Sequence, residues 1–107
     1  MSDLSIQVEQ PGNELTIVRL TGLFEGMAAV EGGPQLSDIL KKIKTPSLWL
    51  DFSCIEYIDS AALAVLIELA KEAAVRKIKF SLYRPVANVK KVLSITNVNK
   101  IISIIED

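Results

Sequence analysis

One short apolar segment limits the possible folds more than any other feature of the chain. Residues 47–52 read Ser-Leu-Trp-Leu-Asp-Phe, and the centre of this run is apolar without interruption. Such a centre is typical of a parallel strand that is covered on both faces. The segments before and after it have the apolar spacing of helices, which favours an α/β arrangement.

Two helices are predicted around this strand. Pro34 suits the first position of a helix, and we expect a helix from there to about residue 43. Its apolar face would consist of Leu36, Ile39, Leu40 and Ile43. A second helix is predicted over residues 60–76, with Leu63, Leu66, Ile67, Ala70 and Ala74 at helical spacing. Residues 21–33 contain four glycines and are expected to form a loop.

The remaining segments complete an alternating pattern. Residues 4–8 alternate between apolar and polar, and a Pro-Gly-Asn turn leads into residues 15–20, so a β-hairpin is predicted. A further strand at 79–83, a helix from Val86 and a terminal strand or short helix at 101–105 follow. We therefore expect one α/β domain over residues 1–107. Its mixed sheet would have four or five strands, parallel after the hairpin, covered by about three to four helices.

The composition argues against several functional classes. Twelve Lys and Arg against 13 Asp and Glu give a net charge of -1, which does not favour nucleic acid or an anionic membrane as partner. Residues 1–70 carry ten acids and four bases, whereas residues 71–107 carry three acids and eight bases. We interpret this asymmetry as two solvated faces. The absence of histidine removes the commonest general base and zinc ligand, so no enzyme, cofactor or metal site is predicted.

The cellular compartment is predicted from similar arguments. Cys54 is the single cysteine and cannot form an internal disulfide, and the chain opens with no signal-peptide pattern. The longest apolar run, residues 61–67, is far shorter than the roughly 20 residues that span a bilayer. We expect a cytoplasmic protein without membrane insertion.

The pair Asp59-Ser60 is the most informative polar feature. Asp59 precedes an apolar helix and is a natural N-cap, which would leave the Ser60 hydroxyl uncommitted at the first helical position. If Ser60 were itself the cap, its hydroxyl would be occupied. Taken alone, the pair indicates helix capping and nothing more.

The helix that follows is apolar all round over residues 61–67. Such a helix is either deeply buried or covered on one side by a partner. Leu23, Phe24 and Met27 in the expected loop are open to the same two interpretations, as core anchors or partner contacts.

Residues 48–63, Leu-Trp-Leu-Asp-Phe-Ser-Cys-Ile-Glu-Tyr-Ile-Asp-Ser-Ala-Ala-Leu, resemble the signature of the STAS domain, the anti-sigma factor antagonist family. Residues 20–25 resemble that family's strand, glycine and acidic residue. Residues 80–83 and 86–93 resemble its last strand and helix. The resemblance thus covers nearly the whole chain and implies a STAS-like sandwich.

The resemblance also implies a function and its residues. Ser60 matches the serine that a dedicated kinase phosphorylates, Asp59 the acid before it, and Asp51 a strand-end aspartate that organises the loop. It implies a non-enzymatic anti-sigma factor antagonist. Such a protein binds an anti-sigma factor or GHKL-type serine kinase when unmodified and is released by phosphorylation, acting as a monomer or weak dimer. The chain departs from the pattern at Ala62 (usually glycine) and Glu25 (usually aspartate), and by about four extra residues before Leu36.

The expected partner surface joins the expected loop to the start of the second helix. It consists of Leu23, Phe24, Glu25, Met27, Ala61, Ala62 and Val65. The basic side of the third helix, with Lys90 and Lys91, would stay in solvent.

Two alternatives remain open at this point. The first is a STAS subunit of an ABC-type lipid transporter. The second is a receiver-like phospho-acceptor or small enzyme using Asp51. The first hairpin lacks the acidic pair that a receiver needs for magnesium, and Cys54 has no histidine to activate it.

Overall fold

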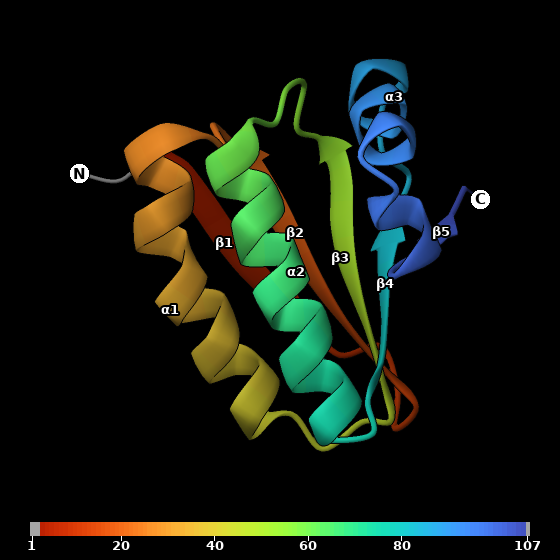
Figure 1. Cartoon of the computed structure of the whole chain (residues 1–107). Coiled ribbons are helices and arrows are strands. Elements are labelled where there is room, and N and C mark those ends of the chain that lie inside the picture. Colours follow the sequence, from red (N-terminus) through yellow and green to blue (C-terminus); the bar gives the residue numbers. More distant parts are fainter. Residues whose placement is uncertain (1–2, 107) are drawn as a thin grey trace.

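The computed structural model describes residues 3–106 and consists of a five-stranded sheet with helices packed against it (Figure 1). The strand order is β1-β2-β3-β4-β5; β1 and β2 are antiparallel, and all later pairs are parallel. The elements are β1 Leu4–Glu9, β2 Leu15–Gly22, α1 Gly26–Lys42, β3 Ser47–Cys54, α2 Ser60–Val75, β4 Lys79–Tyr83, α3 Ala87–Ile95, a 3-10 turn Val98–Lys100 and β5 Ser103–Ile105. The predicted α/β class, mixed sheet and element order are confirmed.

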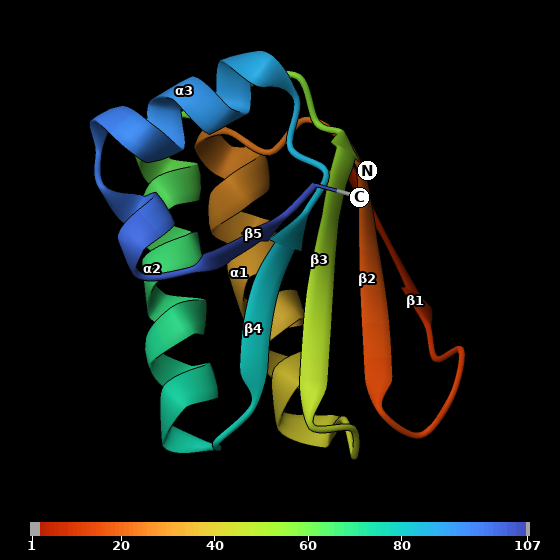
Figure 2. The same ribbon diagram turned by 90° about the vertical axis from the view of Figure 1, so that its right-hand side faces the viewer.

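The three helices lie on one side of the sheet, and within residues 3–106 no helix covers the other side (Figure 2). On the helical side, alternate strand residues form the core with α1 and α2, for example Val18, Leu50 and Leu82. Burying each such side chain contributes about 1.5–3 kcal/mol.

The expectation that residues 47–52 are covered on both faces is therefore wrong. Leu48, Leu50 and Phe52 are buried, whereas Trp49 on the open face is only half-buried. The Trp49 ring stacks on Tyr83 of the neighbouring strand, with centroids 4.8 Å apart. The apolar run is therefore covered by helices on one face only. On the open face its Trp49 packs on the ring of Tyr83.

The first helix also differs from the prediction, since α1 begins at Gly26 and Pro34 is its ninth residue. Residues 26–33 are therefore helical and do not form a loop. One of their glycines serves packing: a Cβ on Gly32 would lie 2.8 Å from Leu4 Cδ2, whereas one on Gly33 would lie 3.4 Å from Val65 Cγ2, close to ordinary contact. Glycine at position 32 therefore lets α1 approach β1 closely.

Candidate functional site

The first turns of α1 and α2 lie side by side and are joined through one carboxylate. Asp59 Oδ1 accepts the Ala62 N–H at 3.0 Å, and Oδ2 accepts the Gly26 N–H at 2.9 Å. A parallel bridge between Phe24 and Ile58 holds the two preceding segments together. The hydrogen bonds from Ala62 and Gly26 lower the pKa of Asp59 against the opposing effect of burial. Asp59 is the N-cap of α2, as predicted.

Ser60 is the first residue of α2 and is exposed. Because Asp59 satisfies the cap, the Ser60 hydroxyl has no hydrogen-bond partner within residues 3–106. An uncommitted hydroxyl at the amino end of a helix is accessible for modification, and a phosphate placed there would meet the positive end of the helix dipole.

Two residues of the expected partner surface belong to the core. Phe24 is fully buried and packs edge-to-face on Phe52, with ring centroids 5.6 Å apart. Ala62 is also fully buried, so its methyl does not narrow access to Ser60. The expectation that these two side chains contact a partner is therefore wrong, because the bridge between residues 24 and 58 directs Phe24 inward.

The other members of that expected surface are accessible in different degrees. Met27 is 68% exposed and Leu23 is 50% exposed, whereas Glu25, Ala61 and Val65 are half-buried. The bond between Asp59 and Gly26 joins the start of α1, just after Leu23 and Glu25, to the start of α2. Their role in partner binding stays a prediction.

Asp51 lies within β3 on the open face and is buried. Its Oδ1 accepts the Ser53 N–H at 2.9 Å and its Oδ2 accepts the Arg19 Nε–H at 3.2 Å; Arg19 also contacts Glu9 at 2.8 Å. Burial would raise the pKa of Asp51, but the hydrogen bonds from Ser53 and Arg19 outweigh it and lower that pKa. Asp51 therefore lies three residues before the end of β3 and bonds to Arg19 of β2 and to Ser53 of its own strand. Within residues 3–106 these hydrogen bonds involve neither the loop that follows β3 nor Ser60.

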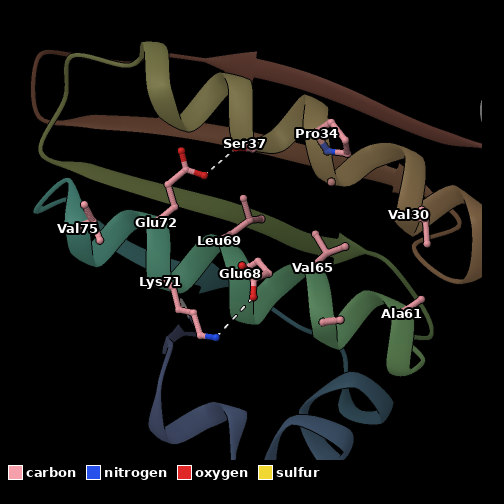
Figure 3. A pocket seen from close by; sticks show the side chains of 12 residues that line it. Val30, Pro34, Ser37, Ala61, Val65, Glu68, Leu69, Lys71, Glu72 and Val75 are labelled. Atoms are coloured by element: carbon pink, nitrogen blue, oxygen red, sulfur yellow. Dashed lines mark hydrogen bonds and ion pairs between the residues drawn. The ribbon is translucent and has the colours of Figure 1, made fainter.

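A groove of about 650 Å³ lies between α1 and α2 (Figure 3). On α2 it begins at Ala61, next to Ser60, and extends along the helix to Val75. Val30 and Pro34 of α1 lie opposite Ala61 and Val65 of α2. At the far end Ser37 Oγ lies 2.7 Å from Glu72 Oε1. The sequence did not reveal this groove because one of its walls was expected to be a loop.

No helix in the described part of the chain is long and apolar enough to cross a membrane. Cys54 is exposed and unpaired.

A protein-family model and several solved structures match nearly the whole chain. The family model of the STAS domain matches residues 5–107. The anti-sigma factor antagonist SpoIIAA in its unphosphorylated form superposes with a TM-score of 0.76 at 17% identity, over 94% of this chain and 87% of that one.

Two further structures have the same fold. One is a putative anti-sigma factor antagonist of Thermotoga maritima, with a TM-score of 0.73 and 22% identity, over 95% of this chain and 86% of the other. The second is the murine Solute Carrier 26 family member A9 anion transporter, with a TM-score of 0.77 and 14% identity, over 94% of this chain and 19% of the transporter.

Proposed function

The chain belongs to the STAS domain family, and we propose that it is a non-enzymatic, cytoplasmic regulatory module. In this proposal it binds an anti-sigma factor or related GHKL-type serine kinase through the Ser60 end of α2. Phosphorylation of Ser60 ends this binding. The observation that carries the proposal is the exposed Ser60 hydroxyl, left free because Asp59 caps the helix.

The proposed switch acts on the interface and leaves the fold intact. A phosphate on Ser60 adds a charge of about -1.5 to -2. The amino end of α2 tolerates such an anion, typically with a gain of about 0.3–1 kcal/mol. A partner packed over the adjacent Ala61 would instead meet a bulky, hydrated group beside the Asp59 carboxylate. Repulsion and desolvation then lower the affinity, and each 1.4 kcal/mol lost is about tenfold.

The proposed partner surface is apolar around the Ser60 hydroxyl. It consists of Leu23, Met27 and Val30 on the α1 side, with Ala61 and Val65 on the α2 side. Protein–protein interfaces commonly have an apolar centre, where most of the binding energy arises, and a polar rim. The groove between the helices extends this surface.

The experiment is a pull-down from the native cytoplasm with wild type, Ser60→Ala and Ser60→Asp, followed by identification of the bound proteins. We expect wild type and Ser60→Ala to retain a GHKL-type kinase and Ser60→Asp to retain at least about tenfold less. Asn99→Asp, which adds one charge at an exposed residue of the 3-10 turn, is the matched control and is expected to bind like wild type.

Equal retention by wild type and Ser60→Asp would contradict the switch. Recovery of an ABC ATPase and permease in place of a kinase would assign the domain to a transporter complex. An unfolded Ser60→Asp protein by circular dichroism would show that Ser60 has a structural role.

A further inference from the structure

The end of the molecule opposite Ser60 carries a concentration of basic side chains, which we call the basic end. Figure 1 shows that the carboxyl ends of α1 and α2 and the start of β4 meet there, far from the amino end of α2. The basic end consists of Lys41, Lys42, Lys44, Arg76, Lys77 and Lys79, all exposed. Three of them lie in residues 41–44 and three in residues 76–79, so folding brings together basic side chains from two separate parts of the sequence.

The basic end is hollowed at its centre. A pocket of about 310 Å³ is lined by Lys41 and Lys44 on one side and by Arg76 and Lys77 on the other. Leu40, Ile43, Thr45, Pro46 and Ile78 complete its wall. Four cationic side chains from the carboxyl ends of α1 and α2 and the residues that follow them thus border one small pocket.

Most of this charge is not neutralised by the protein. Within residues 3–106, Arg76 alone among the six forms an ion pair, between its Nε and Glu72 Oε2 at 3.3 Å. Asp38 lies one turn before Lys41 in α1, and within residues 3–106 it forms no ion pair. The basic end therefore has an excess of positive charge in a chain whose net charge is -1.

Helix ends explain only part of this pattern. Lys41 and Lys42 lie in the last turn of α1, where a cation offsets the negative end of the helix dipole. That effect is confined to the last turn, so it does not explain Lys44, Lys77 or Lys79, which lie outside the helices.

Lys77 also has an unfavourable backbone. It follows the C-cap of α2 with φ of 59°, the left-handed conformation that glycine usually adopts after a helix. Any residue with a Cβ is disfavoured there. A lysine therefore stands on the rim of the pocket where stability alone would favour glycine.

We propose that this pocket binds a phosphate group, carried either by a soluble phosphorylated compound or by a lipid headgroup. Phosphate offers several acceptor oxygens, which matches cations that converge from different sides. Within residues 3–106 the Arg76 guanidinium makes a single hydrogen bond, from Nε to Glu72 Oε2, so its two terminal nitrogens have no protein partner. These can donate to phosphate while the lysines act as mobile point charges. The site lies apart from Ser60, so both ends can be occupied together.

The test is a titration of the ¹⁵N-labelled protein with sodium pyrophosphate, followed by amide chemical shifts. The reference is a titration with sodium chloride to the same ionic strength. We expect saturable shifts at residues 41–46 and 76–79 that chloride does not reproduce. The double variant Lys44→Gln/Lys77→Gln is expected to bind at least about tenfold more weakly. Lys91→Gln/Lys100→Gln removes the same charge from exposed residues elsewhere and is expected to stay within about twofold of wild type.

A second variant separates binding from stability. Lys77→Gly relieves the left-handed backbone strain, so it is expected to raise the melting temperature while weakening pyrophosphate binding about fivefold. A purely structural lysine would not give this opposite pair of changes.

Co-sedimentation with vesicles of phosphatidylglycerol and phosphatidylcholine distinguishes the source of the phosphate. Binding to these vesicles, lost in Lys44→Gln/Lys77→Gln, together with weak pyrophosphate binding, would assign a lipid headgroup. Saturable pyrophosphate binding without vesicle binding would assign a soluble ligand. Amide shifts equal to those in sodium chloride, together with no vesicle binding, would overturn the proposal. So would an equal loss of affinity in Lys44→Gln/Lys77→Gln and Lys91→Gln/Lys100→Gln.

Discussion

Asp59 and Gly26 are joined by a hydrogen bond of 2.9 Å between residues that are 33 positions apart in the chain. The same carboxylate caps α2 through the Ala62 N–H. One side chain thus sets where both helices begin and joins the start of α1, which contains Met27, to the start of α2, which contains Ser60. The geometry of the proposed partner surface depends on this one acid.

Asp59→Ala is expected to lower the free energy of unfolding by about 1–3 kcal/mol. The substitution removes an N-cap, which contributes about 0.5–2 kcal/mol, and it also removes the acceptor for the Gly26 N–H. Urea unfolding measures the change. Asp59→Asn keeps one carbonyl oxygen to cap α2 and is expected to lose less. Wild-type stability of Asp59→Ala would show that neither bond contributes.

Acid sensitivity is expected from the two aspartates with lowered pKa. The pKa values of Asp51 and Asp59 are lower in the folded protein than the usual value of about 3.9 for an unfolded chain. The unfolded chain therefore takes up protons first as the pH falls. The stabilisation is fully present above about pH 5 and is lost as the pH falls below about 4, through the folded pKa values.

Urea unfolding of wild type, Asp51→Asn and Asp59→Asn across pH 3–7 checks this sign. The stability difference between wild type and each variant should be largest near pH 7 and should shrink below about pH 4. A difference that grows on acidification would contradict the lowered pKa values.

The sequence predicted the elements whose signals are local. Alternation in β1 and the 3.6-residue spacing of α2 give their type directly, and Asp59 directly before an apolar run indicates the cap. The start of α1 was missed because glycines and a proline locally favour a loop. What makes the segment helical is tertiary: the bond from Gly26 to Asp59 and the close approach of Gly32 to Leu4.

Side-chain exposure in the site was predictable only in part. Leu23 and Phe24 are adjacent apolar residues with the same local signal, yet one is exposed and the other is in the core. The bridge to Ile58 decides between them, and no local pattern encodes that pairing. The groove between α1 and α2 was missed for the same reason.

Phe24→Ala is expected to destabilise the fold by about 3–5 kcal/mol, because it removes a fully buried ring that packs on Phe52. Any loss of partner binding should then follow the fraction of unfolded protein. Thermal unfolding together with binding below the transition separates the two effects. A folded, fully stable Phe24→Ala protein that no longer binds the partner would show that the Phe24 side chain contacts the partner directly.

Met27→Ala is the complementary test, since Met27 is exposed beside the bond between Gly26 and Asp59. Its stability should stay within about 0.5 kcal/mol of wild type, as for most surface substitutions. Its affinity for the partner should fall about tenfold if Met27 is part of the buried centre of the interface. Isothermal titration with the captured partner gives the value, and Val8→Ala on the edge strand β1 is the exposed apolar control. Equal losses in both variants would place the interface elsewhere.

Gly33→Ala tests whether the glycines of α1 serve packing or flexibility. Residue 33 is helical, and a Cβ there would meet Val65 Cγ2 at 3.4 Å, close to ordinary contact. The substitution should therefore stabilise the protein by up to about 1 kcal/mol, because alanine favours the helix more than glycine does. Gly32→Ala should gain less or destabilise, because its Cβ would lie 2.8 Å from Leu4 Cδ2 and the leucine must move. Urea unfolding of both variants decides the point: a Gly33→Ala protein less stable than Gly32→Ala would mean that α1 packs more tightly on α2 at residue 33 than it does on β1 at residue 32.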